Sequence, residues 1–128
     1  MTPLLLDVSR LFHRRLTDKL ITGIDRVSLA YVRHYAGHAR AVVGVRPFFS
    51  VLSASESERA FRLLLEPETH GARDYAALMA RGYARWWTRP AVAGSVLLNT
   101  SHTGLEYPGY ASALRRRGAR PVFFVHDL

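Results

Sequence analysis

Three short segments of this chain carry residue types that could bind a phosphorylated ligand. They are residues 22–27, where Gly23 precedes Arg26 at the expected start of a helix, residues 99–104 and residues 125–127. Glycine allows a ligand to approach the backbone closely, and the N–H groups at the start of a helix attract anions. The first segment opens a helix one loop after an apolar run typical of a strand, and the other two lie at the ends of such runs, so the three predict one ligand-binding edge of a sheet.

In the first segment Thr22, Gly23, Asp25 and Arg26 are the candidates for binding a phosphate group. Gly23 offers a backbone N–H, and Arg26 offers a guanidinium that could stabilise charge on a diphosphate leaving group. The structural alternative is an ordinary helix start with a solvated Arg26.

The other two segments supply candidates for binding hydroxyl groups and for catalysis. His102, Thr103 and Gly104 could contact an acceptor, although such residues are also common turn formers. His126 could hydrogen-bond a donor or acceptor hydroxyl, and Asp127 could orient the loop or accept a hydroxyl. Successive residues of a strand point to opposite faces, so these neighbours need not form a hydrogen-bonded pair, and both could instead cap the loop.

The elements that must position these residues alternate along the chain. Apolar runs predict strands at 4–8, 41–45, 95–99 and 121–125, with 47–52 extending the second strand or forming an edge strand. Helical spacing predicts helices at 24–37, from a Ser55/Glu58 capping box to 66, at about 73–89 and at 108–117. Residues 9–21 are expected to form a mobile charged loop.

This order predicts an α/β fold, a Rossmann-like, mostly parallel sheet with helices on both faces. The strand at 4–8 is expected near the middle of the sheet. At 128 residues the chain fits one domain.

Composition favours an anionic partner. The formal net charge is +8, and Lys19 is the only lysine among 18 basic residues. Nucleic acid, acidic phospholipid or the diphosphate of a sugar nucleotide would satisfy this charge, although GC-rich coding also favours arginine. Dispersed arginines without a nucleic-acid-binding motif argue against nucleic acid. The chain has no cysteine, which excludes disulfides and fits the cytosol, and its other histidines lack metal-ligand spacing, so no metal is expected.

One further segment has the composition of a membrane-surface helix. Arg85, Trp86, Trp87 and Arg89 interleave cationic and aromatic side chains, which suits contact with anionic headgroups. Packing of the tryptophans in the core is the alternative. No run approaches the roughly 18 apolar residues that span a bilayer, and the first residues lack a basic leader, so a soluble or peripheral protein is expected.

Taken together, Thr-Gly-Ile-Asp-Arg-Val at 22–27, Leu-Leu-Asn-Thr-Ser-His-Thr-Gly-Leu at 97–105 and Arg-Pro-Val-Phe-Phe-Val-His-Asp-Leu at 120–128 resemble bacterial retaining glycosyltransferases of the GT4 type. The resemblance covers nearly the whole chain and implies the N-terminal, acceptor-side domain of a GT-B fold. Many relatives have a second glycine where this chain has Asp25, which could instead cap the helix or contact a sugar hydroxyl.

The resemblance implies sugar transfer from a nucleotide-sugar donor to a saccharide acceptor, commonly lipid-linked, in the biosynthesis of cell-surface polysaccharides. It further implies a cytoplasmic enzyme, peripheral on the inner face of the plasma membrane, without a metal or other cofactor. Because the chain ends where the family continues into a C-terminal donor-binding domain, these 128 residues alone are expected to be inactive. The face left uncovered could pair with a second copy. A stand-alone Rossmann-like nucleotide- or anion-binding module without catalysis is the alternative.

Overall fold

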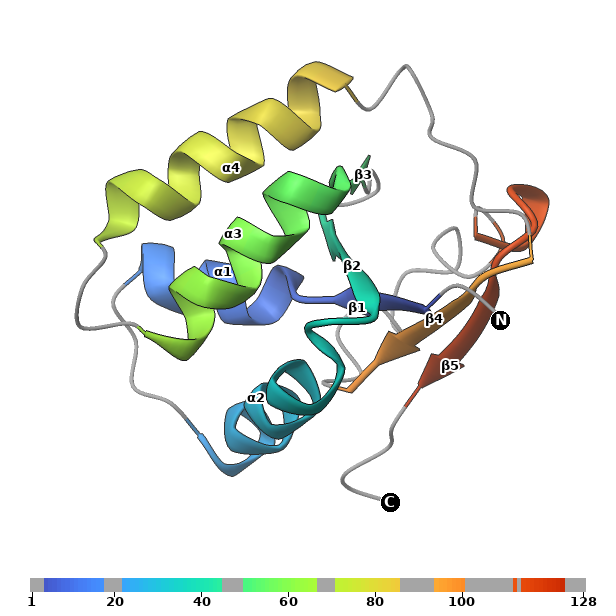
Figure 1. The fold of residues 1–128 in the computed structure, drawn as a ribbon, viewed down its shortest axis with the longest axis horizontal. Coiled ribbons are helices and arrows are strands. Elements are labelled where there is room, and N and C mark those ends of the chain that lie inside the picture. The colour runs from blue at the N-terminus through green and yellow to red at the C-terminus, as the bar shows by residue number, and fades with distance from the viewer. Residues whose placement is uncertain are drawn as a thin grey trace.

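The computed structural model describes residues 4–17, 22–44, 50–66, 71–85, 94–100, 112 and 114–123. Five strands form one sheet in the order β3-β2-β1-β4-β5 (Figure 1). They are β1 (Leu4–Asp7), β2 (Ala39–Val43), β3 (Ser50–Val51), β4 (Val96–Asn99) and β5 (Arg120–Phe123). All neighbouring strands are parallel except β3, which is antiparallel to β2. The fold is therefore α/β and Rossmann-like with β1 in mid-sheet, as the sequence predicts.

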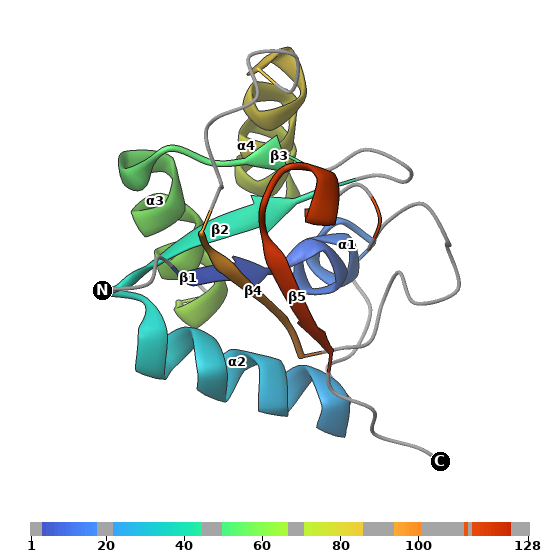
Figure 2. The same ribbon diagram turned by 90° about the vertical axis from the view of Figure 1, so that its right-hand side faces the viewer.

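Helices lie on both faces of this sheet. The helices α1 (Ser9–Leu16), α2 (Gly23–Tyr35), α3 (Ala54–Leu65) and α4 (Ala72–Arg85) gather on one side, and a short helical turn at 114–116 lies on the other (Figures 1 and 2). This arrangement confirms the predicted two-sided cover within the described residues. Half of the predicted helix at 108–117 lies outside them.

The register of the sheet explains why the strands are apolar without alternation. Leu6 pairs with Ala41 and Leu98, and this row faces the core formed with α1 to α4. Leu5 and Leu97 face the opposite way, where they pack with Leu114 in a second cluster. Because β1 is covered on both faces, every position from Leu4 to Leu6 can be apolar.

The prediction of a mobile loop at 9–21 is wrong for its first half, because Ser9–Leu16 form the helix α1. Leu11 and Phe12 of α1 are buried in the core, and the Phe12 ring meets Tyr75 of α4 edge to face at 5.1 Å. Val8, Leu11, Phe12 and Leu16 recur at helical spacing, so the apolar pattern indicates this helix in spite of the charged residues between them. Packing of Leu11 and Phe12 in the core stabilises it.

The capping box of α3 lies two residues earlier in the sequence than predicted. Ser53 is the N-cap residue and Glu56 closes the box, whereas the prediction was Ser55 and Glu58. Both pairs have the required spacing. Ser53 has the extended backbone of an N-cap residue, while Glu58 lies within the helix and pairs with Arg62. The strand β2 similarly begins two residues before its predicted start, and β3 takes the edge-strand alternative.

A buried serine joins α3 to the sheet. The Ser57 hydroxyl accepts a hydrogen bond from the backbone N–H of Ala41 at 2.9 Å and donates one to the carbonyl of Leu52 at 3.3 Å. Ser57 thus satisfies two backbone groups beside the edge strand β3, where the regular ladder of hydrogen bonds ends.

Substituting Ser57→Ala should lower the free energy of unfolding by about 1 to 3 kcal/mol, because the buried N–H of Ala41 loses its partner, whereas the Leu52 carbonyl keeps the Arg40 Nε at 2.9 Å. Urea unfolding followed by circular dichroism measures the change. Ser55→Ala, at an exposed position of the same helix, is the matched control and should cost less than about 0.5 kcal/mol. Equal losses in the two variants would contradict this account.

Candidate functional site at the carboxyl edge of the sheet

The topology places a switch point at the carboxyl ends of β1 and β4. The connection from β1 leads to β2 on one side of this point, while β4 and β5 lie on the other side. Ligands of open α/β sheets bind where the connections diverge in this way. The helix α1 starts here, because Ser9 follows β1 by two residues and its N–H donates to the Asp7 carboxylate at 2.9 Å.

The helix α2 also begins at this edge. Its first turns lie beside the carboxyl end of β4 (Figure 2), where Ser28 of α2 meets Thr100. Thr22 is the N-cap residue: its hydroxyl accepts from the Asp25 N–H at 3.3 Å, while the Asp25 carboxylate accepts from the Thr22 N–H at 2.9 Å. Two of the predicted phosphate-binding residues, Thr22 and Asp25, thus form a reciprocal cap. Capping is one of the two roles that the sequence suggests for Asp25.

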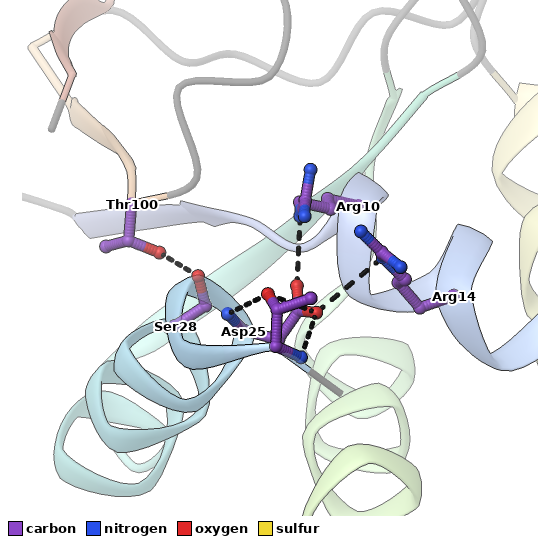
Figure 3. Close-up of polar contacts among 6 residues, drawn as sticks. Arg10, Arg14, Asp25, Ser28 and Thr100 are labelled. Atoms are coloured by element: carbon purple, nitrogen blue, oxygen red, sulfur yellow. Dashed lines mark hydrogen bonds and ion pairs between the residues drawn. The ribbon is translucent and has the colours of Figure 1, made fainter. Parts of the chain in front are cut away.

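Two arginines of α1 converge on the carboxylate of Asp25 (Figure 3). The Arg10 Nε donates to Oδ1 at 2.9 Å, and the Arg14 Nε lies 3.6 Å from Oδ2. The Asp25 side chain is fully buried, whereas the side chains of Arg10 and Arg14 are 24% and 23% exposed. This ion-pair cluster fastens α1 to the first turn of α2.

The cluster sets the charge state of Asp25. Burial raises the pKa of this carboxyl, but the hydrogen bond from the Thr22 backbone, the hydrogen bond from Arg10 and the Thr22 hydroxyl together outweigh burial. The pKa of Asp25 therefore lies below its ordinary value of 3.8. At neutral pH the site contains a buried carboxylate and two guanidiniums.

A second polar contact connects α2 with β4. The Thr100 hydroxyl, at the end of β4, donates to the Ser28 hydroxyl at 2.7 Å, and both side chains are buried (Figure 3). Thr100 belongs to the predicted segment 99–104, and Ser28 directly follows the segment 22–27. The structure thus brings two of the three predicted ligand-binding segments together at one edge.

Gly23 and Arg26 leave room for a ligand at the start of α2. Both residues are exposed, and a Cβ placed on Gly23 would meet no atom within 4 Å. The helix itself therefore does not require glycine at this position. Any requirement for glycine here would come from a molecule that approaches the backbone.

Several predicted site residues fall outside the described part of the chain. These are His102, Thr103, Gly104, His126 and Asp127, together with Trp86, Trp87, Arg89 and the side chain of Arg85. Among the described residues, no three His, Asp or Glu side chains are grouped as metal ligands. No helix within the described ranges is both long and apolar enough to cross a membrane.

Sequence reasoning missed Arg10 and Arg14 as site residues. Their spacing of four places them on one face of a helix, but that signal has meaning only once 9–16 is known to be helical. Their partner Asp25 is 15 residues from Arg10, beyond the reach of any local pattern.

No protein-family model, curated protein or solved structure matches the chain. The class of the protein is therefore described from its fold and its site. It is a Rossmann-like α/β protein with two helix N-termini and an arginine pair at the carboxyl edge of its sheet.

The lowered pKa of Asp25 predicts a stability that depends on pH. An unfolded Asp25 titrates near 3.8 and the folded one lower, so its charged form stabilises the fold above that value, and this contribution is lost as the pH falls through the folded pKa. Asp25→Asn should cost about 1 to 3 kcal/mol at pH 6. In chemical denaturation, the gap between wild type and variant should shrink steadily below about pH 4. A gap that stays constant down to pH 2 would contradict the assignment.

Proposed function

We propose that this chain is the acceptor-side domain of a retaining glycosyltransferase that uses a nucleotide-diphosphate sugar. One observation carries the proposal: the N-termini of α1 and α2 meet Arg10 and Arg14 at the carboxyl edge of a Rossmann-like sheet. Backbone N–H groups and guanidiniums are the donors that proteins use for phosphate groups. The resemblance of segments 22–27, 97–105 and 120–128 to GT4-type enzymes supplies the reaction class.

In this proposal the donor diphosphate lies against the first turn of α2. Gly23 gives it access to backbone N–H groups, and the exposed Arg26 adds a charge-assisted hydrogen bond. Negative charge develops on the diphosphate as the bond to the sugar breaks, so donors fixed at that position lower the barrier. His102, Thr103 and Gly104 would contact the acceptor, while His126 and Asp127 would contact the reacting sugar.

Transfer then requires a second domain that closes over the donor, as a cleft that excludes water does in enzymes of this kind. A saccharide on a lipid carrier is the proposed acceptor, with the protein cytoplasmic and peripheral at the inner face of the plasma membrane. The segment with Arg85, Trp86, Trp87 and Arg89 would face that surface.

Nucleotide binding tests the first step. Titration calorimetry with UDP and GDP should show binding to the chain that weakens about tenfold in Arg26→Ala, since a charged hydrogen bond contributes roughly 1.5 kcal/mol. Arg33→Ala is the matched control, because Arg33 is also an exposed arginine and lies in the last turn of the same helix. Equal weakening in the two variants would mean that general charge, rather than the start of α2, attracts the nucleotide.

Gly23→Ala separates ligand access from folding. The fold has space for the methyl group, so the free energy of unfolding should stay within about 1 kcal/mol of wild type, while nucleotide affinity should fall. Transfer itself is measured by incubating the natural gene product with nucleotide sugars and membrane extracts. Nucleotide binding without transfer would favour a binding module, and absence of both would refute the proposed function.

A further inference from the structure

The cluster around Asp25 sets one buried carboxylate against two arginines. Each guanidinium is still about a quarter exposed. Both guanidiniums therefore remain accessible at the carboxyl edge of the sheet, where the Asp7 carboxylate accepts the Ser9 N–H and the start of α2 carries a partial positive charge.

The contact geometry orients both arginines without using up their donors. Arg10 binds Asp25 through a hydrogen bond from Nε, and Arg14 approaches with Nε at 3.6 Å, the separation of an ion pair rather than of a hydrogen bond. An arginine carries five N–H donors in a planar fork. Figure 3 shows both side chains extending from α1 toward the same carboxylate, so the remaining N–H groups of the two forks belong to one small region.

A comparable cap elsewhere in the chain is more exposed. Asp74 stands in the first turn of α4, accepts the N–H of Gly71 at 3.2 Å and pairs with Arg59 at 3.8 Å. It thus repeats the position and capping role of Asp25, but with 36% of its side chain exposed. The complete burial of Asp25 exceeds what capping a helix requires.

Burying the Asp25 carboxylate costs desolvation free energy, and two helices can be joined without that cost. Apolar residues of similar size often stabilise such a contact as well as a buried ion pair does. A carboxylate held between two arginines resembles, in charge and in its planar oxygens, the anion that arginine forks bind in ligand sites. It can hold the forks in place when no ligand is present.

We propose that Arg10 and Arg14 form a binding site for a phosphoryl group, and that Asp25 is an internal anion that orients both guanidiniums and competes with the ligand for their charge. The inference deepens the proposed function, because a nucleotide diphosphate is the donor that would supply such a group. A free or lipid-borne phosphate offers the same chemistry.

The test measures binding of inorganic pyrophosphate to the full chain by calorimetry. Asp25→Asn keeps an oxygen that can accept the Thr22 N–H but removes the competing charge, so pyrophosphate affinity should rise about fivefold. The matched control Asp74→Asn alters the equivalent cap of α4 and should leave the affinity unchanged. An unchanged affinity in Asp25→Asn would overturn the proposal, since a purely structural ion pair predicts it.

A second variant keeps the proposal testable if Asp25→Asn folds poorly. Arg14→Gln removes the longer contact and leaves the Arg10 hydrogen bond in place, and its pyrophosphate affinity should fall about tenfold. Arg59→Gln, which removes the arginine partner of Asp74, should bind like wild type. If Arg14→Gln also binds like wild type, the arginine pair is not the site.

Further arms identify the source of the phosphoryl group and separate the two proposals. UDP binding more tightly than glycerol 3-phosphate would support a nucleotide, and the reverse order would support a lipid headgroup, both through the same pair of arginines. If Arg14→Gln weakens pyrophosphate binding while the natural gene product transfers no sugar, the phosphoryl site stands and the proposed transferase fails. If transfer occurs and Arg14→Gln changes neither binding nor transfer, the opposite conclusion follows.

Discussion

The carboxylate of Asp25 is the interaction on which the arrangement of this edge depends. It is buried, it caps α2 through Thr22, and it holds Arg10 and Arg14 of α1. Both helices lie between β1 and β2 in sequence, so their relative position determines what stands in front of the carboxyl end of β1. A single charged group thereby couples the start of one helix to the face of another.

The strands and the central place of β1 were accessible from sequence because the signals are local and strong. Runs such as Leu4-Leu5-Leu6 are apolar on both faces, which is typical of a strand in the middle of a parallel sheet. The start of α2 at Gly23 was also close to prediction, because a cap residue precedes it directly. The helix α1 was missed although Val8, Leu11, Phe12 and Leu16 recur at helical spacing, because the many charged residues between them suggested a loop.

The site was predictable only where its residues belong to local motifs. Thr22, Gly23, Asp25 and Arg26 stand together in the sequence and occupy one helix start in the structure. Arg10, Arg14 and the Ser28–Thr100 contact depend on chain segments up to 72 residues apart, and no spacing rule connects them. The pleat and register of the sheet, rather than residue type, decide that β4 ends beside α2.

The two edges of the sheet have a consequence for how copies of the protein can meet. One edge strand as described, β3, is two residues long and antiparallel, and the other, β5, includes Pro121, which has no N–H to donate. Short strands and proline are the means by which natural sheets resist pairing with a strand of another molecule. Strand-to-strand growth into a continuous intermolecular sheet is therefore disfavoured at both ends, so association between copies would proceed through side-chain surfaces instead of backbone hydrogen bonds.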